Sequence, residues 1–137
     1  MKRVYAIGVF DLFHVGHLRF LEQAKKCGDI LVVGVCSDDL CAAHKYKPVI
    51  DEHQRLEVVK ALRIVDDAII YNELKQTVYA DVFAIGEDYG ALSEHEENLR
   101  HYQESGTTTV RILRTPEIST TIIKERIWTS GSSEPKR

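Results

Sequence analysis

The segment VYAIGVFDLFHVGH, residues 4–17, decides the fold of this chain. Its first half is a continuous apolar run, which is typical of a strand buried on both faces of a parallel sheet. Its second half carries His14 and His17 on either side of Val15 and Gly16, where a helix is expected to begin. A strand that leads directly into a helix is the first half of a β-α unit, so this segment predicts an α/β fold.

The rest of the chain repeats this order of strand and helix. Further strands are expected at residues 29–36, 68–71, 81–85 and 108–113, and helices at 16–26, 51–62, 93–106 and 120–128. This order predicts a Rossmann-like, doubly wound, five-stranded parallel sheet with helices on both faces. We expect one domain at residues 1–128 and a disordered tail at residues 129–137, which is rich in Ser and charged residues.

Composition excludes several classes of protein. The chain has 137 residues, with 18 Lys and Arg against 21 Asp and Glu and a formal net charge of −3. A nucleic-acid-binding domain that relies on overall charge is usually strongly basic, so no nucleic-acid partner is expected. The uncharged runs fall far short of the ~20 residues that span a bilayer, so no membrane partner is expected. Three cysteines without a Cys-x-x-Cys spacing are typical of reduced thiols, and we expect a cytoplasmic protein.

Ligands of open parallel sheets bind beyond the carboxyl ends of the strands, where the strand order reverses. The segments expected at that edge are residues 8–17, 37–47, 86–89 and 114–121. The functional site is therefore predicted among these four segments.

His14 and His17 are three residues apart at the expected helix start, so both rings lie on one face of its first turn. Gly16 leaves room for a ligand to approach the backbone. A helix N-terminus attracts anions, and two imidazoles can donate hydrogen bonds to a phosphate there. A capping or surface role fits the same spacing. A zinc site has weaker support, because no third ligand lies at a recognisable metal spacing.

Positive charge near the other strand ends fits the same interpretation. Lys45 and Lys47 lie in the segment HKYK after the second strand, where a lysine can neutralise a phosphate or simply face solvent. Arg55 and Arg63 are eight residues apart on one helix and share a face. Residues 114–121, RTPEISTT, place hydroxyls at the start of the last helix, where they bind phosphate or cap the helix.

Several known catalytic motifs are missing from the sequence. No Gly-x-Gly-x-x-Gly follows the first strand, and no phosphate-binding loop of the form Gly-x-x-x-x-Gly-Lys-Ser/Thr is present. No Gly-x-Ser-x-Gly nucleophile elbow is present either. We therefore expect chemistry by positioning and charge stabilisation.

The run GVFDLFHVGH, residues 8–17, resembles the H-x-G-H signature of the nucleotidyltransferase superfamily in its cytidylyltransferase form. Residues 114–121 resemble the second signature of that family, R-T-E-G-I-S-T-T, with Pro116 and Glu117 in place of Glu and Gly. The segment 52–67 also follows the family pattern. The resemblance covers residues 3–128 and is nearest to the glycerol-3-phosphate cytidylyltransferases. It is also clear for the choline-phosphate cytidylyltransferases, especially at residues 33–38.

This resemblance implies a cytidylyltransferase catalytic domain at residues 1–128. Such an enzyme transfers CMP from CTP to a small phosphorylated alcohol, here most simply glycerol 3-phosphate. The transfer is an in-line attack that releases pyrophosphate without a covalent intermediate. The resemblance further implies Mg²⁺ bound with CTP and a homodimer. Alternatives are another acceptor (phosphocholine, phosphoethanolamine, a phosphonate or a sugar phosphate), ATP as the donor, or a nucleotide-binding protein without activity.

The resemblance also assigns roles to matching residues. The catalytic set is His14, His17, Lys45 and Arg114. The nucleotide-binding set is Val9, Phe10, Asp11, Gly16, Arg63, Asp88, Thr115, Ile118, Ser119 and Thr120. Lys47 and Arg55 are assigned to the acceptor, and no residue is assigned as a protein ligand of a metal.

Overall fold

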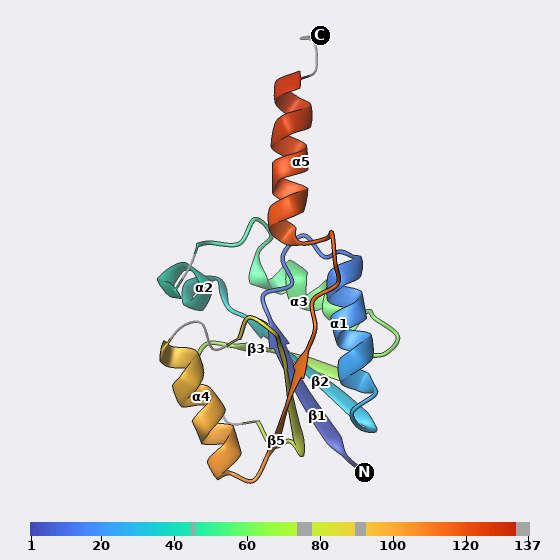
Figure 1. Cartoon of the computed structure of the whole chain (residues 1–137), viewed down its shortest axis with the longest axis vertical. Helices are drawn as coiled ribbons and strands as arrows, with labels where there is room; N and C mark the ends of the chain where they lie inside the picture. Colours follow the sequence, from blue (N-terminus) through green and yellow to red (C-terminus); the bar gives the residue numbers. More distant parts are fainter. Residues whose placement is uncertain (45, 74–77, 90–92, 134–137) are drawn as a thin grey trace.

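The computed structural model describes residues 1–44, 46–73, 78–89 and 93–133, and it confirms the expected fold (Figure 1). The strands are β1 (Arg3–Gly8), β2 (Ile30–Cys36), β3 (Asp67–Tyr71), β4 (Val82–Gly86) and β5 (Thr108–Ile112). The helices are α1 (Val15–Lys25), α2 (Asp38–His44), α3 (Glu52–Lys60), α4 (Ser93–Glu104) and α5 (Thr120–Ser133).

The five strands form one parallel sheet in the order β3-β2-β1-β4-β5. The chain runs outward from β1 to β3, and then returns to the other side of β1 to add β4 and β5. The strand order therefore reverses between β1 and β4, and the carboxyl ends of these two strands mark the crevice where ligands of such sheets bind.

Each face of the sheet has its own hydrophobic core, because successive side chains of a strand point to opposite faces. On β1, Val4 and Ala6 belong to the core that includes residues of α1 and α3. Tyr5 and Ile7 belong to the core that includes residues of α2 and α4. Figure 1 shows α2 and α4 on one side of the sheet and α1 on the other.

Two helices differ from the sequence prediction. Helix α2 lies in a segment for which no helix is predicted from the sequence. The Ser37 hydroxyl accepts a hydrogen bond from the Leu40 N–H (3.1 Å) and caps this helix. Helix α5 continues to Ser133, although we expected it to end near Trp128. Gly131 lies inside it, and one glycine costs a helix only about 1 kcal/mol. Residues 134–137 of the expected tail lie outside the described residues.

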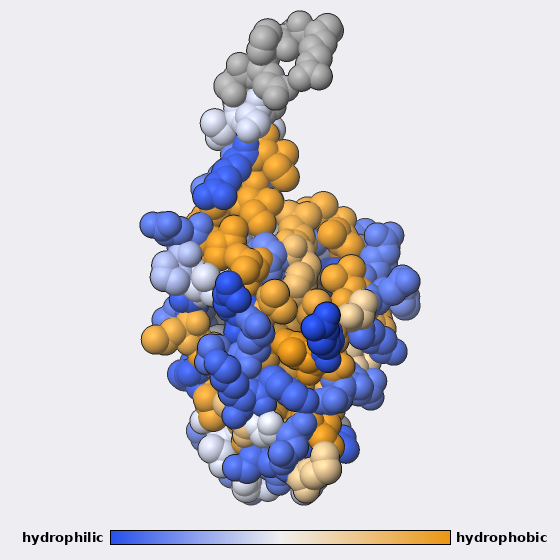
Figure 2. All heavy atoms as spheres, turned by 90° about the vertical axis from the view of Figure 1, so that its right-hand side faces the viewer, coloured by the Kyte–Doolittle hydropathy of each residue, from blue (hydrophilic) through white to orange (hydrophobic). Residues whose placement is uncertain are grey.

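Helix α5 projects from the body of the molecule (Figure 1). Ile127 and Trp128 on this helix are 62% and 80% exposed. Figure 2 shows that apolar side chains continue from α5 onto the body below it. Over the ranges that the structure describes, no helix combines the length and the apolar character needed to cross a membrane.

Candidate functional site

The loop between β1 and α1 turns through two residues in the left-handed region, Phe10 (φ 58°) and Leu12 (φ 50°). Residues other than glycine rarely adopt this conformation unless the surrounding structure enforces it. The Phe10 ring is only 4% exposed and packs against His17 (5.6 Å between centroids) and Phe20 (6.4 Å). Phe10 is a core anchor of this loop, which corrects the expectation that its side chain lines the nucleotide site.

The two histidines of the first signature are bonded to the start of α1. His14 is the N-cap, and its Nδ1 accepts the Gly16 N–H (3.0 Å). The Nδ1 of His17 accepts the His14 N–H (3.2 Å), and the two rings stack with centroids 3.9 Å apart. A neutral ring whose Nδ1 accepts a hydrogen bond carries its proton on Nε2. The backbone therefore makes both histidines Nε2–H donors, so capping and anion binding are compatible roles.

Gly16 has no side chain, and this lets the two signatures pack closely against each other. A Cβ at this position would lie 2.7 Å from Cε1 of His14 and 3.2 Å from Cγ2 of Ile118. The space beside Gly16 thus holds the His14 ring and Ile118, which corrects the expectation that a ligand approaches the backbone there. Ile118 brings the second signature against the first.

Burial keeps both histidines uncharged at neutral pH. The pKa of His17 is lowered to about 4, chiefly by burial and next by the neighbouring charge on His14, while Asp11 acts in the opposite direction. Burial also lowers the pKa of His14. Neutral Nε2–H donors can bind phosphate oxygens without a proton having to move first.

These pKa values predict a loss of stability in acid that depends on His17. The unfolded chain binds a proton on this residue below about pH 6.5, whereas the folded chain does so only near pH 4. Above pH 6.5 the ring is neutral in both states and its protonation does not lower the free energy of unfolding. As the pH falls toward 4, protonation of the unfolded chain lowers this free energy progressively, by up to about 3 kcal/mol. Urea unfolding at pH 7.5, 5.5 and 4.0 measures it.

The matched variants are His17→Asn, which should flatten this pH dependence, and His53→Asn, which removes an exposed histidine of α3 and should leave it unchanged. Equal losses of unfolding free energy in wild type and His17→Asn would contradict the assignment.

Asp11 ties three distant segments together. Its carboxylate is 2% exposed and accepts the backbone N–H groups of Val49 (2.9 Å) and Ile50 (2.9 Å) in the α2–α3 connection. Its carbonyl accepts the Thr120 hydroxyl (3.0 Å) at the start of α5. Asp11 therefore builds the site without facing it, which corrects its expected place in the nucleotide-binding lining.

The N-terminus of α5 lies against that of α1. The Ser119 hydroxyl accepts the Ile122 N–H (3.1 Å) and caps α5. The Thr120 hydroxyl lies 3.4 Å from Nε2 of His14, and Thr115 is half-buried in the preceding loop. Two helix N-termini thus bring partial positive charge to one region, which is an arrangement suited to a polyphosphate.

Glu117 has a left-handed backbone with φ of 64°, at the position where the second signature has glycine. This conformation costs a residue with a Cβ about 1–2 kcal/mol. We expect Glu117→Gly to raise the free energy of unfolding by about 0.5–1 kcal/mol after the larger entropy of a glycine-containing unfolded chain is included. Urea unfolding measures this gain.

Glu125→Gly, inside α5, is the matched control, because the same substitution at a helical position should destabilise by about 1 kcal/mol. Destabilisation by Glu117→Gly would show that the glutamate side chain makes a compensating contact.

Arg114 and Asp88 are expected at opposite ends of the nucleotide, but they form an ion pair with each other. The Arg114 N–H also donates to the Glu87 carboxylate (2.8 Å). Both side chains are exposed at the carboxyl edge of β4 and β5. Arg114 and Asp88 therefore lie together at the edge of the site.

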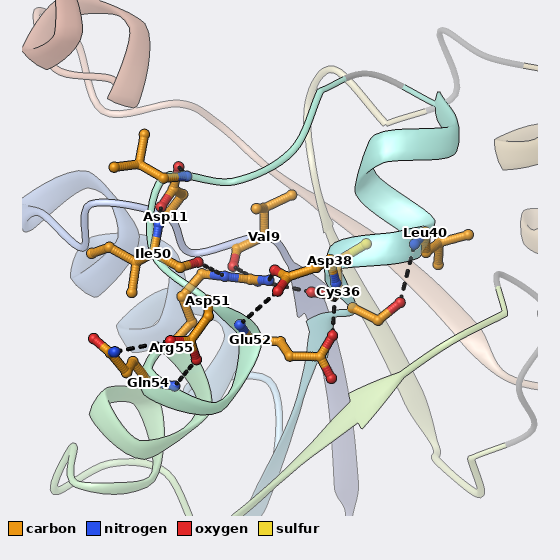
Figure 3. A network of polar contacts seen from close by, with 12 residues as sticks. Val9, Asp11, Cys36, Asp38, Leu40, Ile50, Asp51, Glu52, Gln54 and Arg55 are labelled. Carbon is orange, nitrogen blue, oxygen red and sulfur yellow. Dashed lines mark hydrogen bonds and ion pairs between the residues drawn. The ribbon is translucent and has the colours of Figure 1, made fainter.

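Arg55 is the centre of a buried polar network (Figure 3) and is itself 2% exposed. Its guanidinium donates to the carbonyls of Ile50, Val9 and Cys36 (each 2.8 Å) and to the Asp38 carboxylate (2.6 Å). These bonds connect the ends of β1 and β2 to the starts of α2 and α3. Arg55 is thus a structural residue, which corrects its expected contact with the acceptor.

Arg63 lies away from the site. It is exposed in the turn between α3 and β3, three residues before Asp66, whose N–H donates to the Leu31 carbonyl (3.0 Å) at the beginning of β2. That is the amino-terminal edge of the sheet, so the structure does not bring Arg63 together with the other predicted site residues.

The two candidate lysines lie in the α2–α3 connection. Lys45 falls outside the described residues. Lys47 is exposed. It follows Tyr46, whose ring centroid lies 4.1 Å from Nζ of Lys124 on α5. It precedes Val49 and Ile50, whose N–H groups bind Asp11. The zinc interpretation gains no support, because among the described residues no three His, Cys, Asp or Glu side chains are grouped to hold a metal ion.

A cavity of about 220 Å³ lies at the carboxyl ends of β1 and β2, on the sheet face that carries α2 and α4. We name it the aromatic pocket; its lining includes Val9, Leu40, Tyr46, Tyr71, Tyr89 and His95. Of these six residues, only Val9 is predicted from the sequence to bind a ligand. A larger open hollow of about 660 Å³ lies at the opposite, amino-terminal edge of the sheet, around Tyr79 and Asp81.

Comparison with known proteins finds a matching family model and similar sequences. Residues 5–126 match the family model described as cytidylyltransferase-like. The chain is 40% identical over 144 aligned residues to an FAD synthase of Ferroglobus placidus, covering 99% of this chain and 94% of that protein. It is 42% identical over 134 residues to an FAD synthase of Archaeoglobus profundus, covering 90% and 85%. These names differ from the glycerol-3-phosphate cytidylyltransferase that the motifs suggest.

Among solved structures, the chain is similar to one described as the lipopolysaccharide core biosynthesis protein of Thermoplasma volcanium. The TM-score is 0.73 at 35% identity, over 84% of this chain and 98% of that one. A protein of unknown function from Archaeoglobus fulgidus has the same fold, with a TM-score of 0.65 at 20% identity, over 82% and 89%.

Proposed function

This chain belongs to the cytidylyltransferase-like family, and from that premise we propose that it is a nucleotidyltransferase that moves AMP from ATP to FMN, forming FAD and pyrophosphate. The names of the relatives, FAD synthase, support this choice of substrates. The observation that carries the chemistry is the pair of Nε2–H donors of His14 and His17 at the start of α1, beside the start of α5.

The reaction in this proposal is a single in-line displacement. A phosphate oxygen of FMN forms a bond to the α-phosphorus of ATP, while the bond from that phosphorus to the bridging oxygen breaks and pyrophosphate leaves. Negative charge grows on the oxygens around the α-phosphorus. The Nε2–H groups of His14 and His17 stabilise this charge, and the amides at the starts of α1 and α5 bind the remaining phosphates.

Mg²⁺ fits this site as a companion of the triphosphate. Such ions are usually held by one or two carboxylates together with substrate phosphates and water. Asp11 is excluded as a ligand because its carboxylate is buried and bonded to the backbone. The exposed carboxylate of Glu117, in the second signature, is the candidate that would hold the ion. When bound, Mg²⁺ would neutralise part of the phosphate charge.

CMP transfer from CTP to glycerol 3-phosphate is the second candidate, supported by the similarity of residues 8–17 and 114–121 to the cytidylyltransferase signatures. Both candidates use the same attack on an α-phosphorus. They differ only in the base and the acceptor.

One matrix of assays separates the candidates. Pyrophosphate release is measured with ATP, CTP, GTP and UTP against FMN, glycerol 3-phosphate, phosphocholine and phosphoethanolamine, and products are identified by chromatography. We expect release with ATP and FMN together, with FAD as the product. Release with CTP and glycerol 3-phosphate instead would establish the second candidate. Nucleotide binding without release in any combination would establish a protein without this activity.

A homodimer remains a prediction of the family resemblance. The exposed Ile127 and Trp128 of α5 offer apolar surface for such an interface. Light scattering of the purified chain should give twice the mass of one chain.

A further inference from the structure

We infer that the aromatic pocket holds the isoalloxazine ring of the flavin, with Tyr89 as the ring against which it packs. This inference rests on the proposed function, and it adds the place and the residues of flavin recognition. Its support comes from the structure of the pocket itself, from the size and chemistry of its lining, and from its position relative to the two histidines.

Tyr89 is fixed in place by three neighbours. Its ring stacks on His95 with centroids 4.1 Å apart and an interplanar angle of 13°, and it lies edge-on to Phe83 at 6.0 Å and 87°. Its hydroxyl accepts a hydrogen bond from the Asn98 side-chain amide (2.6 Å), and Asn98 is 1% exposed. Helix α4 supplies both His95 and Asn98, so it presents a preorganised aromatic wall to the pocket.

The buried side-chain amide of Asn98 orients the Tyr89 ring. Among the described residues, its Oδ1 has no hydrogen-bond partner. An asparagine buried with one polar atom unpaired contributes little to stability. Its bond to Tyr89 is therefore best explained by the orientation that it gives the Tyr89 ring, and Asn98 is a positioning residue.

The size and lining of the pocket select a single flat, largely apolar ring system. Its volume of about 220 Å³ is below the roughly 300–1,000 Å³ of complete small-ligand sites. Aliphatic side chains such as Ile7, Val9 and Leu40 line it beside the aromatic rings, and its described lining has no Asp, Glu, Lys or Arg. The dimethylbenzene half of a flavin is apolar, whereas both rings of adenine carry hydrogen-bonding nitrogens. The lining therefore favours the dimethylbenzene half of the flavin ring over adenine.

The position of the pocket fits the two ends of FMN. Gly8 and Val9 line the pocket, and His14, the N-cap of α1, follows Val9 by five residues. The loop between them is held by Phe10 in the core and by the hydrogen bonds that the Asp11 carboxylate accepts from Val49 and Ile50. A ligand with its ring in the pocket can run along this loop and reach the Nε2–H donors with its phosphate. The pocket and the histidines thus correspond to the ring and the reacting phosphate of one acceptor.

Riboflavin tests this inference because it has the ring but no phosphate and cannot accept AMP. Binding is measured through the quenching of riboflavin fluorescence in wild type and in Tyr89→Leu, Tyr89→Phe, Asn98→Leu and Tyr79→Leu. Base stacking on an aromatic side chain is worth ~1–3 kcal/mol, so Tyr89→Leu should weaken binding about 10-fold or more. Tyr89→Phe keeps the ring and should stay within a few-fold of wild type.

Two further variants separate positioning from folding. Asn98→Leu should weaken riboflavin binding several-fold while the melting temperature stays unchanged or rises, because the unpaired Oδ1 is removed. Tyr79→Leu removes an exposed tyrosine at the opposite edge of the sheet and should bind as wild type does.

The inference is overturned if wild type does not bind riboflavin, if Tyr89→Leu binds it as tightly as wild type, or if adenosine displaces it with the same dependence on Tyr89. Failure of the proposed function looks different. Riboflavin that binds through Tyr89 in a protein that makes no FAD would keep the inference and reject the proposed reaction. FAD formation by a protein whose riboflavin binding does not depend on Tyr89 would support the proposed reaction and reject the inference.

Discussion

Replacement of His14 or His17 by asparagine is expected to lower kcat by about 10²–10³-fold, the usual cost of removing one donor to transition-state charge. The Michaelis constants should change little, because the charge that these rings stabilise develops only during the reaction. Asparagine is itself a good N-cap, so His14→Asn should keep the start of α1 intact. Steady-state pyrophosphate release with the active substrate pair measures the effect.

Two comparisons make this experiment specific. His17→Gln places an amide near the position of Nε2 and should recover part of the rate that His17→Asn loses. His53→Asn makes the same substitution at an exposed position of α3 and should keep the wild-type rate. Wild-type turnover by both His14→Asn and His17→Asn would reject the role assigned to the histidine pair.

The largest effect on stability is expected from Arg55→Met. This change leaves three carbonyls and the Asp38 carboxylate without the guanidinium that binds them. Removal of one partner of a buried ion pair costs about 3–5 kcal/mol. Urea unfolding followed by circular dichroism should therefore show a large loss of stability or a chain that does not fold. Arg55→Lys should give an intermediate loss, because lysine keeps the charge but lacks the fork of donors.

Arg63→Met is the matched control, since Arg63 follows the same helix and is exposed. Its unfolding free energy should stay within about 0.5 kcal/mol of wild type. An Arg55→Met protein as stable as Arg63→Met would contradict the central place of Arg55 in the network.

The pair Arg55 and Arg63 also shows where sequence reasoning ends. Their spacing of eight residues predicts one helix face for both, yet α3 ends at Lys60 and Arg63 lies in the turn that follows it. Arg55 is buried and Arg63 is exposed because Arg55 contacts residues far away in the chain. One of these contacts is the Val9 carbonyl, 46 residues before Arg55. Asp11 and Phe10 illustrate the same point, because their burial follows from how three segments pack together.

Local patterns, by contrast, predict most of the fold. The runs that form β1 and β2 are continuous and apolar, and this pattern identifies a strand covered on both faces. His14 and His17 are found from sequence because they lie three residues apart in one segment. Tyr89 and His95 come from a strand end and a later helix, and their stacking becomes visible only when α4 is placed beside the sheet. The second signature reveals Glu117 as a departure, but not its left-handed backbone.

The hydrogen bonds of Asp11 determine when the site can form during synthesis. The hydrogen bond from Thr120 to the Asp11 carbonyl spans 109 residues, whereas the bonds from Val49 and Ile50 span 38 and 39. Contacts of such long sequence separation form late, because the intervening chain must be ordered first. The ribosome must release the segment around Thr120 before the histidine pair meets its second helix. A partly synthesised chain that ends before Thr120 therefore holds the first signature without the second helix start that it packs against.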